Sequence, residues 1–144
     1  INPRLFPEQL IYIINHAEDQ VLFFDRTFLP LVAKLKQQLP TIRAYILLGP
    51  VDDEAEAALP GLIGYDEFKS GGDAHFQWPE LDELTASSLC YTSGTTGNPK
   101  GVLYSRRSTL LHSFAGCSPD ALNISGRDTI LAVVPAARAT VSNI

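Results

Sequence analysis

Two short apolar runs with one helical segment between them constrain the fold of this chain most. Each run is too short for a helix and suits a buried strand: Val21–Phe24 and Ala44–Leu48. Apolar residues recur at helical spacing between Thr27, which opens a helix, and Pro40, which ends it. Strand, helix and strand of this length predict a parallel pair with a right-handed crossover. We therefore predict an α/β fold with a mostly parallel sheet and a βαβ unit within residues 1–48.

Residues 49–84 differ in composition from the rest of the chain. They hold ten acidic residues and one basic residue and show no sustained periodicity. A connecting segment that runs over the surface fits this pattern. Short helical turns are expected at Glu54–Leu59 and Tyr65–Phe68, and Trp78 is expected to anchor the segment by burying its ring. We interpret the acidic residues as a solvated surface and not as metal ligands.

A run of hydroxyl and glycine residues follows the next predicted strand, Ser87–Tyr91. No apolar side chain interrupts the run before it reaches a proline and a lysine. Glycine lets backbone N–H groups approach an anion, and hydroxyls and an ammonium group add further donors. Such a run is also found in ordinary surface turns. We predict an anion-binding loop whose candidate residues are Thr92, Ser93, Gly94, Thr95, Thr96, Gly97 and Lys100.

The remainder of residues 85–144 is expected to be ordered and is basic. Residues 85–144 as a whole, with Lys100 of the loop included, hold five basic and two acidic residues, which favours an anionic ligand near the loop. A short strand is predicted at Gly101–Ser105, a helix capped by Ser108 runs to Cys117, and the last strand spans Asp128–Val134.

Several classes of site and partner are not indicated. Pro99 precedes Lys100 and Gly101 follows it, so the loop is not a Walker A motif, and neither GxGxxG nor GxSxG is present. No basic stripe with interleaved aromatic residues suggests nucleic acid, and no apolar run is long enough for a membrane helix. Cys90 and Cys117 fit no metal or disulfide pattern, so we expect buried free thiols and a cytoplasmic location.

Tyr91–Gly101, with the sequence YTSGTTGNPKG, resembles the phosphate-loop motif of the AMP-forming acyl-adenylate synthetases. Four further stretches are similar to the medium- and long-chain fatty-acyl-CoA synthetase branch: residues 1–5, 15–18, 76–83 and 133–135. The resemblance implies that residues 1–144 form part of the N-terminal adenylation domain, with residues 85–144 as its phosphate-loop segment. The chain has no methionine, and we expect a fragment whose parent holds the family's remaining catalytic residues beyond Ile144.

The resemblance also implies a two-step reaction with small-molecule substrates. ATP and a fatty acid give an acyl-adenylate and pyrophosphate, and the thiol of CoA then displaces AMP. Lys100 is the implied catalytic residue, because its charge would stabilise the departing pyrophosphate. Mg²⁺ is expected on the phosphates, with Thr92 or a neighbouring hydroxyl as one ligand. A homodimer of the parent is a further expectation.

Two positions depart from the family pattern. Relatives have Ser-His-Arg where this chain has Ser105-Arg106-Arg107, and they have an aromatic–His pair in the acyl site where this chain has Ala137 and Arg138. Arginine cannot act as a neutral imidazole does. Two interpretations stay open: Arg138 pairs with the substrate carboxylate, or the match to the family ends at Pro135.

Three hypotheses from different classes follow. The chain is a piece of a fatty-acyl-CoA synthetase or of another acyl-adenylate-forming ligase, such as an aryl-CoA ligase or a luciferase-like enzyme. The second hypothesis is an ATP- or phosphate-binding remnant without catalysis. The third is a structural fragment that does not fold alone. In each case we expect the isolated chain to form no thioester.

Overall fold

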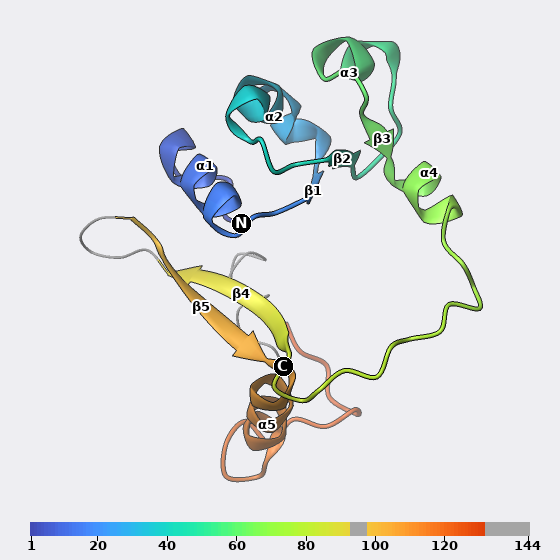
Figure 1. The fold of residues 1–144 in the computed structure, drawn as a ribbon. Coiled ribbons are helices and arrows are strands. Elements are labelled where there is room, and N and C mark those ends of the chain that lie inside the picture. The colour runs from blue at the N-terminus through green and yellow to red at the C-terminus, as the bar shows by residue number, and fades with distance from the viewer. Residues whose placement is uncertain (93–97, 132–144) are drawn as a thin grey trace. The chain divides into compact units, whose positions relative to one another are not determined.

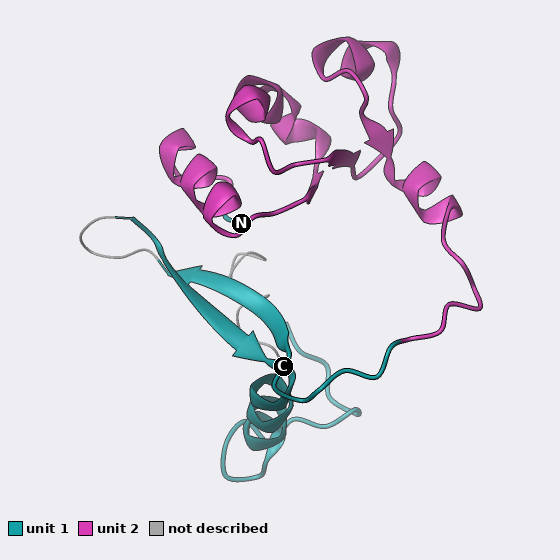
Figure 2. Cartoon of the chain, in the orientation of Figure 1, with its two compact units in different colours: residues 1–2, 79–144 teal, residues 3–78 magenta. Residues whose placement is uncertain are grey.

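A computed structural model describes residues 1–92 and 98–131 and divides the chain into two compact units (Figure 2). The first unit, Pro3–Trp78, contains a three-stranded sheet and is called the sheet unit here. The second unit, residues 1–2 and 79–144, contains a two-stranded hairpin and is called the hairpin unit. Thr92 and Lys100, which flank the predicted anion-binding loop, both belong to the hairpin unit.

Three parallel strands form the sheet unit in the order β1, β2, β3 (Figure 1). They are β1 (Val21–Phe24), β2 (Ala44–Leu47) and β3 (Ile63–Gly64). The register places Val21 opposite Ala44, and both strand pairs are parallel. The predicted α/β class and the parallel β1–β2 pair are therefore confirmed.

The helices of the sheet unit are α1 (Pro7–His16), α2 (Leu29–Leu35), α3 (Asp53–Ala58) and α4 (Tyr65–Ser70). A proline and two acidic capping side chains mark the starts of three helical segments of this unit: Pro7 in α1, Asp25 before the 3-10 turn and Asp52 before α3. Pro7 stands in the first turn of α1, where its missing N–H has no cost. The helix predicted to open at Thr27 begins one turn earlier than α2, as a 3-10 turn at Arg26–Phe28. Its cap is Asp25, whose Oδ1 accepts a hydrogen bond of 2.9 Å from the Thr27 N–H.

The core of the sheet unit surrounds β2. Ile46 and Leu47 on that strand are fully buried. One buried cluster joins the strands to α2 and α3 and comprises Phe24, Leu29, Val32, Tyr45, Leu47, Ala55, Leu59 and Leu62. A second cluster joins α1 to the end of the α2 segment and comprises Leu10, Ile14, Leu35 and Leu39. The apolar periodicity between Thr27 and Pro40 therefore predicted the buried face of the α2 segment.

Residues 49–78 contribute to this core, which the sequence did not reveal. The short helices expected near Glu54 and Tyr65 are present as α3 and α4, but β3 was not predicted. β3 has two residues, too few to show a strand period. A surface ion pair of 2.8 Å joins Arg26 to Asp52, the residue that caps α3. This part of the acidic segment is thus packed onto the sheet and is more than a connection.

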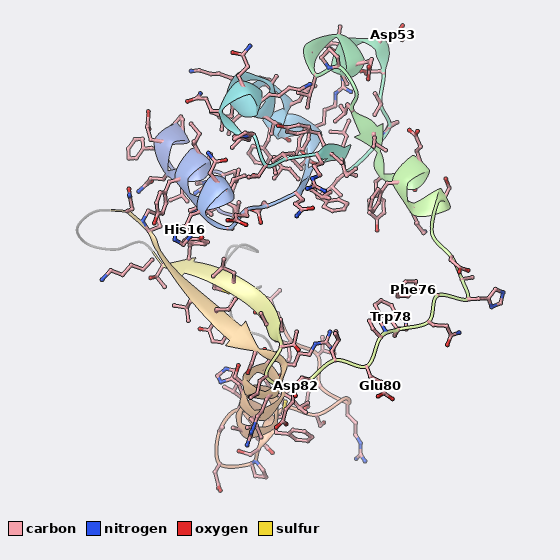
Figure 3. All side chains as sticks on the ribbon, viewed as in Figure 1. His16, Asp53, Phe76, Trp78, Glu80 and Asp82 are labelled. Carbon is pink, nitrogen blue, oxygen red and sulfur yellow. The ribbon has the colours of Figure 1, made fainter. Side chains whose placement is uncertain are left out.

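Trp78 does not bury its ring, so that prediction was wrong. Its side chain is 86% exposed and meets Phe76 edge to face, with ring centroids 5.1 Å apart. Both side chains project from the extended segment that follows α4 (Figure 3). Phe76 is also largely exposed, at 55%, so this contact buries neither ring.

The hairpin unit contains β4 (Ala86–Thr92), β5 (Lys100–Ser105) and α5 (Arg106–Cys117). β4 and β5 are antiparallel, so this pair departs from the parallel arrangement of the sheet unit. Two predicted details differ. Ser105, not Ser108, caps α5: its Oγ accepts from the Ser108 N–H at 3.1 Å. No strand is present at residues 128–131, and the rest of that predicted strand lies outside the described residues.

The described residues of the hairpin unit have almost no buried core. Pro99 is the single buried residue among residues 79–92 and 98–131. Large apolar side chains of β5 and α5 are exposed instead: Val102, Leu103, Leu110, Leu111 and Phe114. The thiols of Cys90 and Cys117 are free as predicted, but they are half-buried and not fully buried.

Candidate functional site

The antiparallel ladder fixes the two flanks of the predicted loop directly opposite each other. Thr92 is the last residue of β4 and pairs with Lys100, the first residue of β5. Directly opposed residues in such a ladder place their side chains on the same face, with Cβ atoms about 4.5–5.5 Å apart. The hydroxyl of Thr92 and the ammonium of Lys100 therefore share one face at the end of the hairpin next to the loop, which is called the mouth of the hairpin here.

Lys100 is exposed and has no ion pair among residues 1–92 and 98–131. Arg107, by contrast, has an acidic partner: its guanidinium lies 3.0 Å from the Glu83 carboxylate. Because no acidic side chain of the described residues pairs with Lys100, its ammonium group is available to an external anion. The flexible side chain of lysine lets the ammonium group follow a phosphate oxygen.

The opposite face of the hairpin is organised around a glycine. Gly101 pairs with Tyr91, and a Cβ at Gly101 would lie 3.3 Å from Cε1 of the Tyr91 ring and 3.1 Å from Cδ1 of Leu89. The tyrosine ring thus lies close to the β5 backbone at Gly101, and any larger residue there would require the ring and the Leu89 side chain to shift. Sequence reasoning assigned neither residue a role, because the contact is visible only once the register is known.

The far end of the hairpin is clamped by backbone hydrogen bonds. The Arg107 N–H donates to the Glu83 carbonyl at 2.9 Å, and the Arg106 N–H donates to the Thr85 carbonyl at 3.0 Å. Together with the Arg107–Glu83 ion pair, these bonds join the residues before β4 to the first turn of α5. These bonds hold the hairpin at the end where Ala86 pairs with Ser105, which is its base. Thr92 and Lys100 lie at the opposite end, at the mouth of the hairpin.

Several predicted site residues cannot be placed. Ser93, Gly94, Thr95, Thr96, Gly97, Ala137 and Arg138 lie outside the described residues. Of the predicted set, the structure brings together Thr92 and Lys100. Within the described residues no group of three or more His, Cys, Asp or Glu side chains could hold a metal ion, and no helix is long and apolar enough to cross a membrane.

Comparison with known proteins decides the family. The sequence model of the family described as AMP-binding enzyme matches residues 1–140. The chain belongs to this family. It is 63% identical over 135 residues to a 3-methylmercaptopropionyl-CoA ligase of Ruegeria pomeroyi, which covers 94% of this chain and 25% of that protein. It is 58% identical, with the same coverage, to a medium-chain-fatty-acid–CoA ligase of Ectopseudomonas oleovorans.

A solved structure of an AMP-binding relative has the same fold. It is an anthranilate CoA ligase in complex with anthranoyl-AMP, with a TM-score of 0.69 and 24% sequence identity. The match covers 81% of this chain and 22% of that chain. The chain thus spans about a quarter of the length of the curated relatives that it matches.

Proposed function

We propose that this AMP-binding chain is part of an acyl-CoA ligase that activates a fatty acid with ATP and transfers the acyl group to CoA. The observation that supports it most is the pairing of Thr92 with Lys100 at the mouth of a hairpin whose sequence matches the family. The two relatives at 63% and 58% identity are named for different aliphatic acids. We therefore propose an aliphatic carboxylic acid of short to medium length as the substrate.

In the proposed first step the carboxylate oxygen bonds to the α-phosphorus and the bond from that phosphorus to pyrophosphate breaks. Negative charge then grows on the β- and γ-phosphate oxygens. In this proposal the Lys100 ammonium stabilises that charge, and the N–H groups and hydroxyls expected from the loop sequence add donors. In the proposed second step the CoA sulfur bonds to the acyl carbon and AMP leaves. Lys100 thus acts by electrostatic stabilisation and not by proton transfer.

Mg²⁺ is the expected metal of this reaction. It takes oxygen ligands, keeps several waters and often binds through substrate phosphates with few protein ligands. The described residues fit that mode, because they offer the Thr92 hydroxyl and no carboxylate cluster. When bound, the metal would neutralise charge on the phosphates, and Thr92 would supply one oxygen to it.

Ala137 and Arg138 are proposed to line the acyl site, where Arg138 would pair with the substrate carboxylate. This proposal rests on sequence position alone. It predicts that Arg138→Ala raises KM for the acid and leaves KM for ATP unchanged. The alternative that the match to the family ends at Pro135 was wrong, because the family model matches residues 1–140.

The proposed activity is tested in a chimeric ligase. In this protein, the matched 135 residues of the R. pomeroyi ligase are replaced by those of this chain. We expect acyl-CoA formation from ATP, CoA and an aliphatic acid, measured by mass spectrometry, and none from the isolated 144-residue chain. A folded chimera that binds MgATP but forms neither acyl-adenylate nor acyl-CoA would favour the non-catalytic phosphate-binding remnant. A cytoplasmic location and a homodimer stay predictions.

A further inference from the structure

β4 contains one residue that has no partner on β5. Ala86 pairs with Ser105, but the next pair toward the loop is Ser88 with Tyr104. Ser87 is therefore an extra residue, a β-bulge of the kind that occurs beside functional sites. From Ser88 onward the shifted register continues to the mouth of the hairpin.

Two hydroxyl groups hold this bulge between the hairpin and α5. Ser87 Oγ donates to the Tyr104 carbonyl at 3.1 Å and lies 3.1 Å from Thr109 Oγ1. Thr109 Oγ1 donates to the Ser105 carbonyl at 3.0 Å. The two hydroxyls have two protons for three contacts, so the Ser87–Thr109 contact shares a proton with one of the carbonyl bonds. The carbonyls next to the bulge are thus satisfied by side chains.

The bulge decides which residue lies opposite Thr92. If the pairing of Ala86 with Ser105 continued without an extra residue, Thr92 would lie opposite Pro99, and Lys100 opposite Tyr91. Neighbouring residues in a strand point to opposite faces, so a slip of one position would move Lys100 to the face away from Thr92. Proline also has no N–H to donate to the ladder.

We propose that Ser87 and Thr109 are positioning residues for the ATP-binding hairpin, because the bulge they hold sets the register that pairs Lys100 with Thr92. This inference rests on the proposed function. The two residues lie at the base of the hairpin, at the end away from the loop, and they act through Lys100 without contacting the nucleotide. Their hydroxyls make the bulged register more favourable than the regular one.

The kinetic test uses the chimeric ligase and compares two changes at one position. Ser87→Ala keeps the extra residue but removes its hydroxyl, and a lost hydrogen bond of ordinary strength predicts an increase of roughly threefold to tenfold in KM for ATP. Deleting Ser87 removes the bulge but leaves Ser88 to Thr92 opposite the same partners, so KM for ATP is expected to stay near that of the unmodified chimera. KM for CoA is expected to change in neither variant.

Matched variants on α5 separate positioning from general stability. Thr109→Val removes the second hydroxyl and is expected to reproduce the effect of Ser87→Ala, whereas Thr109→Ser and Ser87→Thr are expected to restore KM. Ser113→Ala is the control, because the Ser113 hydroxyl bonds to the Thr109 carbonyl within the helix. Its KM for ATP is expected to equal that of the unmodified chimera.

The native thiol of Cys90 reports the register directly, whether or not the chimera is active. Cys90 lies opposite Val102, so a Val102→Cys variant with Cys117→Ser is expected to form a disulfide between Cys90 and the introduced thiol on mild oxidation. Adding Ser87→Ala is expected to lower the disulfide yield, and deleting Ser87 is expected to preserve it. An unchanged yield, or a lowered yield with unchanged KM for ATP, overturns the inference. A chimera without ligase activity that still gives the expected yields refutes the proposed function and leaves the register role supported.

Discussion

Tyr91 lies across Gly101, its directly opposed partner on β5, and a Cβ at that glycine would lie 3.3 Å from the tyrosine ring. An aromatic ring that covers a cross-strand glycine shields the backbone and helps to fix register. The contact is on the face opposite Lys100 and Thr92. It therefore supports the loop end of the hairpin from the face that does not carry Thr92 and Lys100.

Replacing Gly101 with alanine is expected to displace the Tyr91 ring and weaken the hairpin. The new methyl group would also approach Leu89 at 3.1 Å, so two side chains must move. Amide hydrogen exchange in β4 and β5 of the chimeric ligase measures the effect as lost protection. Gly116→Ala is the control, because the new methyl group would meet no atom within 4 Å and the substitution replaces a flexible glycine within α5. It is expected to be neutral or to stabilise by up to about 1 kcal/mol.

Lys100→Ala in the chimeric ligase is expected to weaken MgATP binding by about tenfold to a hundredfold, which corresponds to losing one hydrogen bond to a charged group. Isothermal titration calorimetry measures the dissociation constant. Lys100→Arg, which keeps the charge, is expected to lose less affinity. Lys69→Ala on α4 is the control, because it also removes an exposed lysine without an ion pair among the described residues. Equal affinity of the Lys100→Ala and Lys69→Ala variants would remove Lys100 from the site.

In the isolated chain, hydrogen exchange is expected to divide at the boundary between the two units. Amides of β1 and β2 have a buried core around them and are expected to be protected, whereas amides of β4 and β5 exchange quickly. The measurement is exchange followed by mass spectrometry of peptides on either side of Trp78. Equal protection in both units would show that the hairpin needs no further surface to be stable. No protection anywhere would support the hypothesis that the fragment does not fold alone.

Adjacent leucines at the end of β2 provide a test of the core. Leu47 is fully buried and Leu48 is 49% exposed. Leu47→Ala is expected to lower the free energy of unfolding by about 2–5 kcal/mol, because it leaves a cavity among packed side chains. Leu48→Ala is expected to change it by less than about 0.5 kcal/mol. Urea denaturation of the isolated chain compares the two, and similar losses would contradict the placement of the core.

The Asp52 carboxylate is expected to make the sheet unit sensitive to acid. The Arg26 guanidinium and the Ala55 N–H both bond to this carboxylate and lower its pKa. A lowered folded-state pKa gives stability that is present above the unfolded value, near 3.9, and is lost as pH falls through the folded value. Asp52→Asn keeps a capping oxygen but no charge, so its stability should depend less on pH below about 4 than that of the unmodified chain.

Thermal unfolding at pH 6 and pH 3 measures this difference. At pH 6 the expected order of melting temperature is the unmodified chain, then Asp52→Asn, then Asp52→Ala, which loses both the cap and the ion pair. Between pH 6 and pH 3 the gap between the unmodified chain and Asp52→Asn should narrow. A constant gap would mean that the Arg26 contact contributes nothing to stability.

Local sequence signals predicted part of this fold because their causes are local. The apolar runs of β1 and β2 act within a few residues, and the structure has these strands where they were expected. The two-residue strand β3 and the exposed ring of Trp78 were missed. Both the pairing of β3 and the burial of the Trp78 ring depend on contacts with residues that are distant in the sequence. Local sequence patterns do not reveal such contacts.

The sequence indicates a chemistry for the candidate site, which stays a prediction, but it does not indicate the arrangement of the site. Hydroxyl, glycine and lysine residues in one run indicated an anion-binding loop, and Thr92 and Lys100 lie together at its ends. Their shared face depends on an extra residue at Ser87, and no composition or period identifies a bulge. The roles of Tyr91 and Gly101 were hidden for the same reason, because cross-strand partners follow from register.

All buried apolar side chains of the sheet unit fall between Leu10 and Leu62. A ribosome therefore makes all of these core side chains before it makes Thr92 and Lys100, the described residues of the candidate site. Chains generally fold from the N-terminal side during synthesis. The sheet unit can thus fold before the exposed leucines and phenylalanine of β5 and α5 are translated. Early folding shortens the time during which apolar side chains of both units are exposed to solvent together.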